Sequence, residues 1–114
     1  MSLPEHEKKL AETALARYCE KRIPENVTDK IRLMYRFRGN TATLYETRPP
    51  WTGEGDWTEL PVAQFRYDTK KKLWTLYCAD RNSRWHEYMD SNPAKSISTL
   101  LEEVEDDPTG IFWG

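Results

Sequence analysis

The chain has 114 residues, a formal net charge of −2 and apolar side chains at 38% of its positions. Aromatic residues make up 12% of the chain, which supplies enough buriable surface to exclude a disordered protein. Two cysteines are too few for a disulfide framework, and no apolar run approaches the roughly 20 residues of a membrane span. We therefore expect one domain over residues 1–114 with no membrane contact. Because no basic and then apolar leader opens the sequence, we also expect a cytoplasmic protein.

An amphipathic pattern predicts a first helix from about Pro4 to Lys21. Its apolar positions recur at helical spacing and share one face: Leu10, Ala11, Ala14, Leu15, Tyr18 and Cys19. The dipeptide Ile23-Pro24 should end this helix, because proline disfavours a helical conformation in the residue before it.

From Ile31 onward the apolar period changes to two, which predicts a sheet over about residues 30–89. Gly39-Asn40 suits a two-residue hairpin turn, since both residues tolerate positive φ. This turn sets three opposing pairs in the first hairpin: Arg38 with Thr41, Arg36 with Thr43, and Met34 with Tyr45.

Residues 46–61 are rich in proline and glycine and are predicted to form the one long loop of the chain. A third strand is expected over about residues 61–67, followed by an even-length turn at residues 68–71. This turn predicts two core pairs: Phe65 opposite Trp74, and Ala63 opposite Leu76.

The last hairpin turn is predicted at Asn82-Ser83. The resulting register places Trp85 on the core face together with Trp74 and its neighbours Leu76 and Cys78. It places His86 and Tyr88 on the opposite face. A register slip of one residue would exchange these two sets.

A second helix is expected over about residues 93–106, with Asn92-Pro93 at its start and an apolar stripe that includes Leu100 and Val104. Acidic residues crowd its last turn, where the helix dipole disfavours them, so a basic group from the sheet or a partner should compensate. The apolar tail at residues 108–114 is expected to dock on a core. The elements together predict an α+β fold, a five-stranded antiparallel meander with an N-terminal and a C-terminal helix packed on one face in two layers.

Several motifs resemble a family catalogued as domain of unknown function 3024. The resemblance covers nearly the whole chain and rests on these segments: Arg17-Tyr18-Cys19, Arg48-Pro49-Pro50-Trp51, residues 57–67 (WTELPVAQFRY), Trp74-Thr75-Leu76-Tyr77, residues 80–86 (DRNSRWH) and residues 107–114 (DPTGIFWG). The family pattern favours glycine at the position of Ser83. The resemblance implies no activity, substrate or cofactor.

The open face of the predicted sheet is the first candidate for a binding site. Its arginine, tyrosine and histidine side chains are Arg32, Arg36, Arg38, Tyr45, Arg66, Tyr77, Arg84, His86 and Tyr88. Rings and arginines on a sheet can bind unpaired bases and phosphates. The simpler interpretation is a solvated polar face, which antiparallel sheets commonly have.

The predicted loop is the second candidate, because Arg48, Trp51 and Trp57 lie in a segment that could present an indole to a partner. The alternative is that both tryptophans fold inward and cover an end of the sheet.

Catalytic and metal sites find little support in the sequence. His86 has Asp80 nearby and could act as a general acid or base, but no nucleophile is evident beside it. A surface histidine that pairs across the hairpin is the alternative. Two histidines and two cysteines on separate elements match no metal-binding spacing, and we predict no metal, no cofactor and no catalytic residue.

The sequence favours a binding or interaction module with a protein or small-ligand partner. Its working surfaces would be the open sheet face and the loop between Trp51 and Trp57. Single-stranded nucleic acid is the second choice, because the net charge is negative and the predicted second helix is acidic. A small hydrolase using His86 ranks third. The sequence leaves the oligomeric state open, and with it whether the tail docks in cis or in trans.

Overall fold

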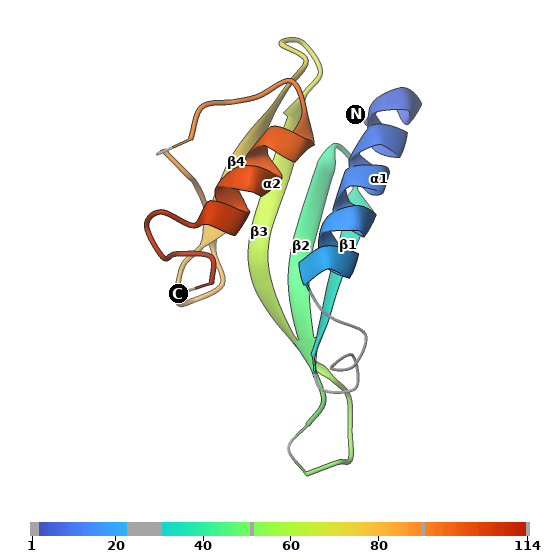
Figure 1. Ribbon diagram of the computed structural model, residues 1–114, viewed down its shortest axis with the longest axis vertical. Coiled ribbons are helices and arrows are strands. Elements are labelled where there is room, and N and C mark those ends of the chain that lie inside the picture. Colours follow the sequence, from blue (N-terminus) through green and yellow to red (C-terminus); the bar gives the residue numbers. More distant parts are fainter. Residues whose placement is uncertain (1–2, 23–30, 51, 90, 114) are drawn as a thin grey trace.

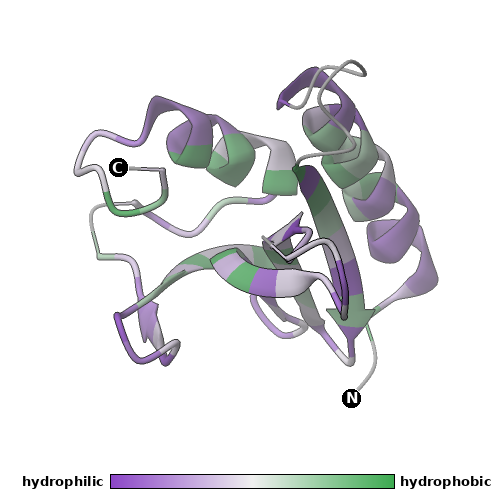
Figure 2. Cartoon of the chain, turned by 90° about the horizontal axis from the view of Figure 1, so that it is seen from below, coloured by the Kyte–Doolittle hydropathy of each residue, from purple (hydrophilic) through white to green (hydrophobic). Residues whose placement is uncertain are grey.

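A computed structural model describes residues 3–22, 31–50, 52–89 and 91–113 of the chain. Its strands form one antiparallel sheet in the order β1-β2-β3-β4-β5. Figures 1 and 2 show both helices on the same side of this sheet, which confirms the predicted α+β fold. The elements are α1 (Glu5–Arg22), β1 (Arg32–Arg38), β2 (Thr41–Arg48), β3 (Thr58–Asp68), β4 (Leu73–Ala79), β5 (Trp85–Glu87) and α2 (Ile97–Asp106).

The hydrophobic core lies between the sheet and the two helices, and the apolar stripe of α2 is turned toward the sheet (Figure 2). Its largest fully buried side chains come from both layers: Leu15 on α1, Leu44 on β2, Phe65 on β3, Trp74 and Leu76 on β4, and Leu100 and Val104 on α2. Because all of these residues point to one side, no helix described here covers the other face of the sheet. No helix in the described ranges has the length and apolarity to cross a membrane.

The first hairpin has the predicted register. Arg38 pairs with Thr41, and Arg36 pairs with Thr43. Gly39 in the turn has φ +60°, the left-handed region in which a residue without a Cβ is not strained. The two-residue turn therefore fixes which side chains of β1 and β2 face water.

The second hairpin has the predicted faces but a different register. Its turn occupies residues 69–72, so Tyr67 rather than Phe65 lies opposite Trp74. Moving a turn by one residue shifts the register by two residues, and a shift of two leaves every side chain on its predicted face. The rings of Tyr67 and Trp74 are 5.1 Å apart, measured between centroids.

The predicted faces of the last hairpin are wrong. Ala79 pairs with Trp85, which puts Trp85 on the open face of the sheet, whereas His86 lies opposite the core residue Cys78. Tyr88 is buried on the helix side, where its ring contacts Phe112 at 5.0 Å between centroids. A one-residue slip has exchanged the two faces.

Hydrogen bonds to Asp80 explain this slip. The backbone N–H groups of Asn82 and Arg84 donate to the Asp80 carboxylate, and the Asp80 N–H donates to the Arg84 carbonyl. These bonds close a loop of residues 80–84, in which Ser83 has φ +61°. A loop with an odd number of residues inverts the faces relative to the two-residue turn that the sequence predicts.

β2 and β3 are longer than predicted and form an arm that projects beyond both helices (Figure 1). They reach Arg48 and start again at Thr58, so the predicted loop of residues 46–61 is shortened to residues 49–57. A bulge at Val62 shifts the register. Pro61 is tolerated in β3 because β4 pairs only with residues 63–68, so no partner strand needs its missing N–H on that side.

α2 begins later than predicted, at Ile97, with Ser96 as its N-cap. Asn92-Pro93 does not start the helix, because the preceding segment is extended along the edge of β4. There Ala94 exchanges two backbone hydrogen bonds with Trp74, of 2.7 and 2.9 Å.

The acidic end of α2 is compensated by α1. The Tyr18 hydroxyl and the Arg22 guanidinium donate to the two oxygens of the Glu105 carboxylate, at 2.8 and 2.9 Å. Burial, and then the bond to Glu105, raise the pKa of Tyr18 well above its usual value. Arg22 also lies over the Trp113 ring, and Phe112 is buried, so the described part of the tail docks on its own domain.

Replacing Ser83→Gly should stabilise the domain by about 1 kcal/mol, because glycine adopts positive φ without the steric cost that a Cβ imposes. Urea unfolding measures this difference. Asn82→Gly is the matched control, since Asn82 lies in the same loop without positive φ and should gain nothing. Destabilisation by Ser83→Gly would contradict the loop conformation.

Replacing Asp80→Ala should lower the melting temperature at about pH 6, and this difference should shrink progressively as the pH falls below 3.8. Backbone donation from Arg84, followed by the contact with His86, lowers the pKa of Asp80 from its ordinary value of 3.8. The ionised carboxylate is therefore the form that stabilises the fold, and its contribution is lost as the pH falls through the lowered pKa. Melting curves followed by circular dichroism test this, with Asp106→Ala as the control. A difference that does not change with pH would contradict the role of the charge.

Candidate functional site

The open face of the sheet is hollowed into a groove of about 840 Å³. Side chains from neighbouring strands line it because alternate residues of each strand point to the same face. The lining residues are Arg36, Arg38, Asn40, Thr41, Thr43, Tyr45, Glu59, Pro61, Gln64, Arg66, Ser83 and Trp85. Three arginines and one glutamate among them make the groove basic.

Arginine side chains lie over aromatic rings along this face. The Arg36 guanidinium is 4.3 Å from the centroid of the Tyr45 ring on the neighbouring strand, and Arg66 is 3.9 Å from the Tyr77 ring. At the arm, Arg32 lies 4.5 Å from the Trp57 ring. Such contacts contribute about 0.5–1 kcal/mol each at exposed sites. They hold the guanidinium groups in place on the sheet before any ligand binds.

Arg36 already binds a carboxylate. Its Nη2 atom is 2.8 Å from Oε1 of Glu59, and the two side chains are 55% and 48% exposed. The hydrogen bond to Glu59 raises the pKa of Arg36 above its usual value. This pair forms because the bulge in β3 brings Glu59 opposite Thr47, two positions along β2 from Tyr45. The contact between Glu59 and Arg36 thus gives the geometry in which a carboxylate of a ligand would bind Arg36.

A second polar chain crosses the groove. Arg66 Nε donates to Gln64 Oε1 at 2.8 Å, and Gln64 Nε2 donates to Thr43 Oγ1 at 3.1 Å. Arg38 lines the same groove and makes no ion pair within the described part of the chain. The groove therefore combines two arginines held by neighbouring side chains with Arg38, which makes no ion pair in the described part of the chain.

The structure brings most of the predicted open-face residues together. Arg32, Arg36, Arg38, Tyr45, Arg66 and Tyr77 lie on this face as predicted. Trp57 joins them through its contact with Arg32.

Other predicted residues lie elsewhere. Tyr88 is wrongly placed by the sequence, since it is buried in the core. Arg84 is exposed in the last hairpin loop and does not line the groove, and Arg48 donates to the buried Glu46 at 2.6 Å. Trp51 falls outside the described residues.

Sequence reasoning missed Trp85 and Glu59 in this groove. Trp85 would have been found by reading residues 80–84 as a single five-residue loop that starts at Asp80, a residue that commonly caps such turns. The position of Glu59 depends on the bulge at Val62, which leaves no clear signal in the alternation of β3.

His86 lies outside this groove. Its Nε2 atom is 2.7 Å from Asp80 Oδ2, and its side chain is 61% exposed. Burial raises the pKa of Cys19 to about 11 and also raises that of Cys78, so both thiols stay protonated and are poor nucleophiles. Among the described residues, no group of three or more histidine, cysteine, aspartate or glutamate side chains could hold a metal ion. The contacts of His86 fit a pair that closes the hairpin loop.

Comparison with known proteins gives one family match. The model of the family described as "Domain of unknown function (DUF3024)" matches residues 3–114. The curated proteins and the solved structures contain no match to the chain. Since the family model covers nearly the whole sequence and agrees with the resemblance of the motifs, the chain belongs to the DUF3024 family.

Proposed function

We propose that this domain is a non-enzymatic interaction module whose open sheet face binds an acidic, extended segment of a partner protein. The observation that carries the proposal is Arg36, which lies over the Tyr45 ring and binds the exposed carboxylate of Glu59. Hydrogen bonds between arginine and a carboxylate are short and among the stronger ones in proteins.

The shape of the groove favours a protein segment over a small ligand. Small-molecule sites enclose most of the ligand surface, whereas this groove is open to solvent and is lined from several strands. Neighbouring strands are about 4.8 Å apart, so Arg66 on β3 lies about 10 Å across the sheet from Arg36 and Arg38 on β1. An extended peptide with several acidic side chains can contact Arg36, Arg38 and Arg66 along this distance.

Single-stranded nucleic acid is the second candidate, and the arginine–aromatic pairs favour it. Bases stack on aromatic rings and arginines contact phosphates in sheet-type binders of this kind. Here, however, Tyr45 and Tyr77 each have an arginine over one ring face, which a stacking base would have to displace. We place the interaction in the cytoplasm, where reducing conditions suit two free cysteines.

Replacing Arg36→Gln should weaken binding of an acidic peptide about tenfold, because one charge-assisted hydrogen bond is lost. The probe is a fluorescein-labelled peptide of about twelve residues with glutamate at every second position, which matches the spacing of side chains on one face of a strand. Fluorescence anisotropy measures its affinity. Arg81→Gln is the matched control, since Arg81 is exposed in the last hairpin loop and does not line the groove. Equal loss in both variants would contradict the proposed site.

Replacing Glu59→Gln should strengthen binding of the same peptide about threefold, because the intramolecular carboxylate no longer competes for Arg36. Weaker binding would show that Glu59 contacts the ligand and would contradict this competition. A labelled oligonucleotide of about twelve uridines provides the second arm of the experiment. If it binds more tightly than the peptide and depends on Arg36, the nucleic-acid alternative replaces the protein partner.

A further inference from the structure

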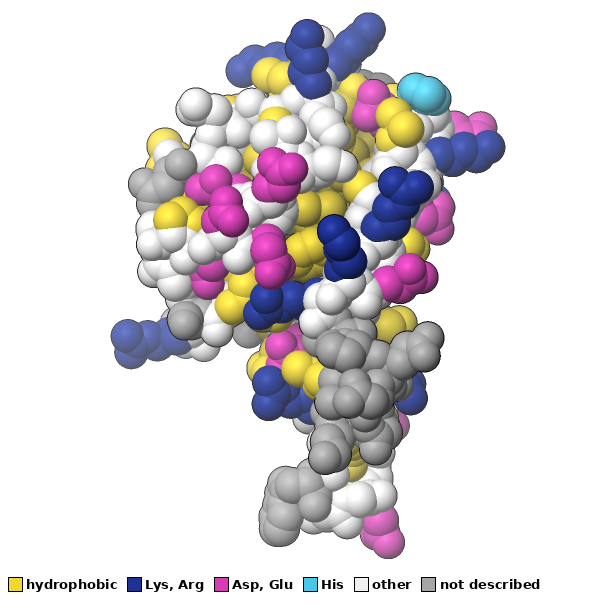
Figure 3. Space-filling model, in the orientation of Figure 1, with side chains coloured by type: hydrophobic (Ala, Val, Ile, Leu, Met, Phe, Trp, Pro, Cys, Tyr) yellow, Lys and Arg dark blue, Asp and Glu magenta, His cyan; other side chains and the backbone are white. Residues whose placement is uncertain are grey.

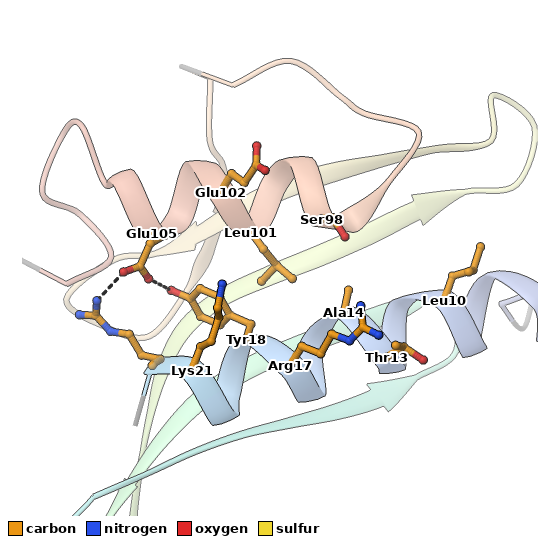
Figure 4. A pocket seen from close by; sticks show the side chains of 11 residues that line it. Leu10, Thr13, Ala14, Arg17, Tyr18, Lys21, Ser98, Leu101, Glu102 and Glu105 are labelled. Carbon is orange, nitrogen blue, oxygen red and sulfur yellow. Dashed lines mark hydrogen bonds and ion pairs between the residues drawn. The ribbon is translucent and has the colours of Figure 1, made fainter. Parts of the chain in front are cut away.

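A second groove lies on the opposite side of the sheet, between α1 and α2, and encloses about 700 Å³ (Figure 4). It does not share a residue with the groove on the open face. The helices are joined at one end, where Tyr18 and Arg22 bind Glu105. Away from this end the groove runs along α1 toward Leu10.

The floor of this second groove is apolar. Leu10 and Ala14 contribute from α1, and Leu101 contributes from α2. Leu10 is 55% exposed, so a large apolar side chain at this groove is in contact with water. A partner with apolar side chains would remove Leu10 from water.

The two rims of the groove carry opposite charge. Figure 3 shows basic side chains along α1 and acidic side chains along α2, with hydrophobic surface between them. Arg17 and Lys21 stand on the α1 rim, and Glu102 stands on the α2 rim. Within the described ranges none of these three makes an ion pair. The groove therefore holds opposite charges apart across an apolar floor.

We propose that this groove docks an amphipathic helix of a partner protein, with an apolar stripe between one acidic and one basic flank. The acidic flank would face Arg17 and Lys21, and the basic flank would face Glu102. Charge complementarity with the two rims selects this occupant. Arg17 and Lys21 are one helical turn apart, which matches acidic residues spaced by four on a docked helix.

The dimensions agree with a helix of about three turns. Positions 10 to 21 of α1 extend over about 17 Å at 1.5 Å per residue. Helix-in-groove recognition uses an apolar stripe of this length, with flanking charges that set orientation and specificity. Because the groove lies on the helix side of the domain, this docking is independent of the open sheet face.

Three designed helical peptides of about fourteen residues test the proposal. They share a leucine stripe and differ in their flanks: one acidic and one basic, both acidic, or both basic. Isothermal titration calorimetry with the full chain should show the tightest binding for the peptide with unlike flanks. Equal affinity for all three peptides, or no binding, would overturn the proposal.

A charge reversal on α1 gives the second test. In Arg17→Glu/Lys21→Glu, the peptide with unlike flanks should bind about tenfold more weakly, and the peptide with two basic flanks should become the tightest ligand. Lys9→Glu is the matched control, since Lys9 is exposed on α1 and does not line the groove. Unchanged preference in the double variant would contradict docking between these rims.

Leu10→Glu keeps the proposal testable if the double variant does not fold, because Leu10 is already exposed. This variant should also fail to bind the peptide with unlike flanks, while its circular dichroism spectrum stays unchanged. Sedimentation of the unmodified chain should show a monomer. Self-association that Leu10→Glu abolishes would assign the groove to a second copy and overturn the proposal.

Discussion

Two helices pack against one face of the sheet and bury the apolar side chains of both layers between them. Trp74 is almost fully buried in this packing, with Tyr67 against its ring and Ala94 bonded to its backbone. Burying one large apolar side chain of this kind contributes about 1.5–3 kcal/mol. Since strand residues alternate, the same packing sends every second side chain to the uncovered face, where the arginines stand. The packing of the core thus determines which side chains are exposed on the open face and can contact a partner.

How much of this arrangement the sequence predicts depends on the turns. Gly39-Asn40 fixes its hairpin because it allows positive φ at the required place, so the faces of β1 and β2 follow directly from the sequence. The last hairpin is different, since side-chain bonds to Asp80 select a longer loop than the residue types suggest. A single residue of loop length moves Trp85 to the open face and buries Tyr88.

The candidate site is likewise predictable only in part from the sequence. The arginines of β1 are predictable from their period, whereas the partner of each arginine is not, because it depends on register across strands. Glu59 reaches Arg36 only through the bulge in β3. The start of α2 was also beyond prediction, since Ala94 is held by a backbone bridge that no local sequence pattern encodes.

The two grooves lie on opposite sides of one sheet and differ in chemistry. The open face is basic and carries arginines held over rings, whereas the groove between the helices is apolar with rims of opposite charge. Occupation of one groove leaves the other accessible, so the two proposals together describe a small domain that joins two partners. Both ion-paired and unpaired charges are exposed at these surfaces. Because salt screens exposed charges, a higher salt concentration should weaken binding at either groove.

We propose that the open sheet face binds acidic protein segments through Arg36 on the edge strand β1 and its neighbours. Titration of the ¹⁵N-labelled domain with the alternating glutamate peptide, followed by amide chemical shifts, tests it most directly. The shifts should be concentrated on β1, β2 and β3 around Arg36, Tyr45 and Arg66, with α1 and α2 unchanged. Shifts confined to the helices, or none at saturating peptide, would contradict it.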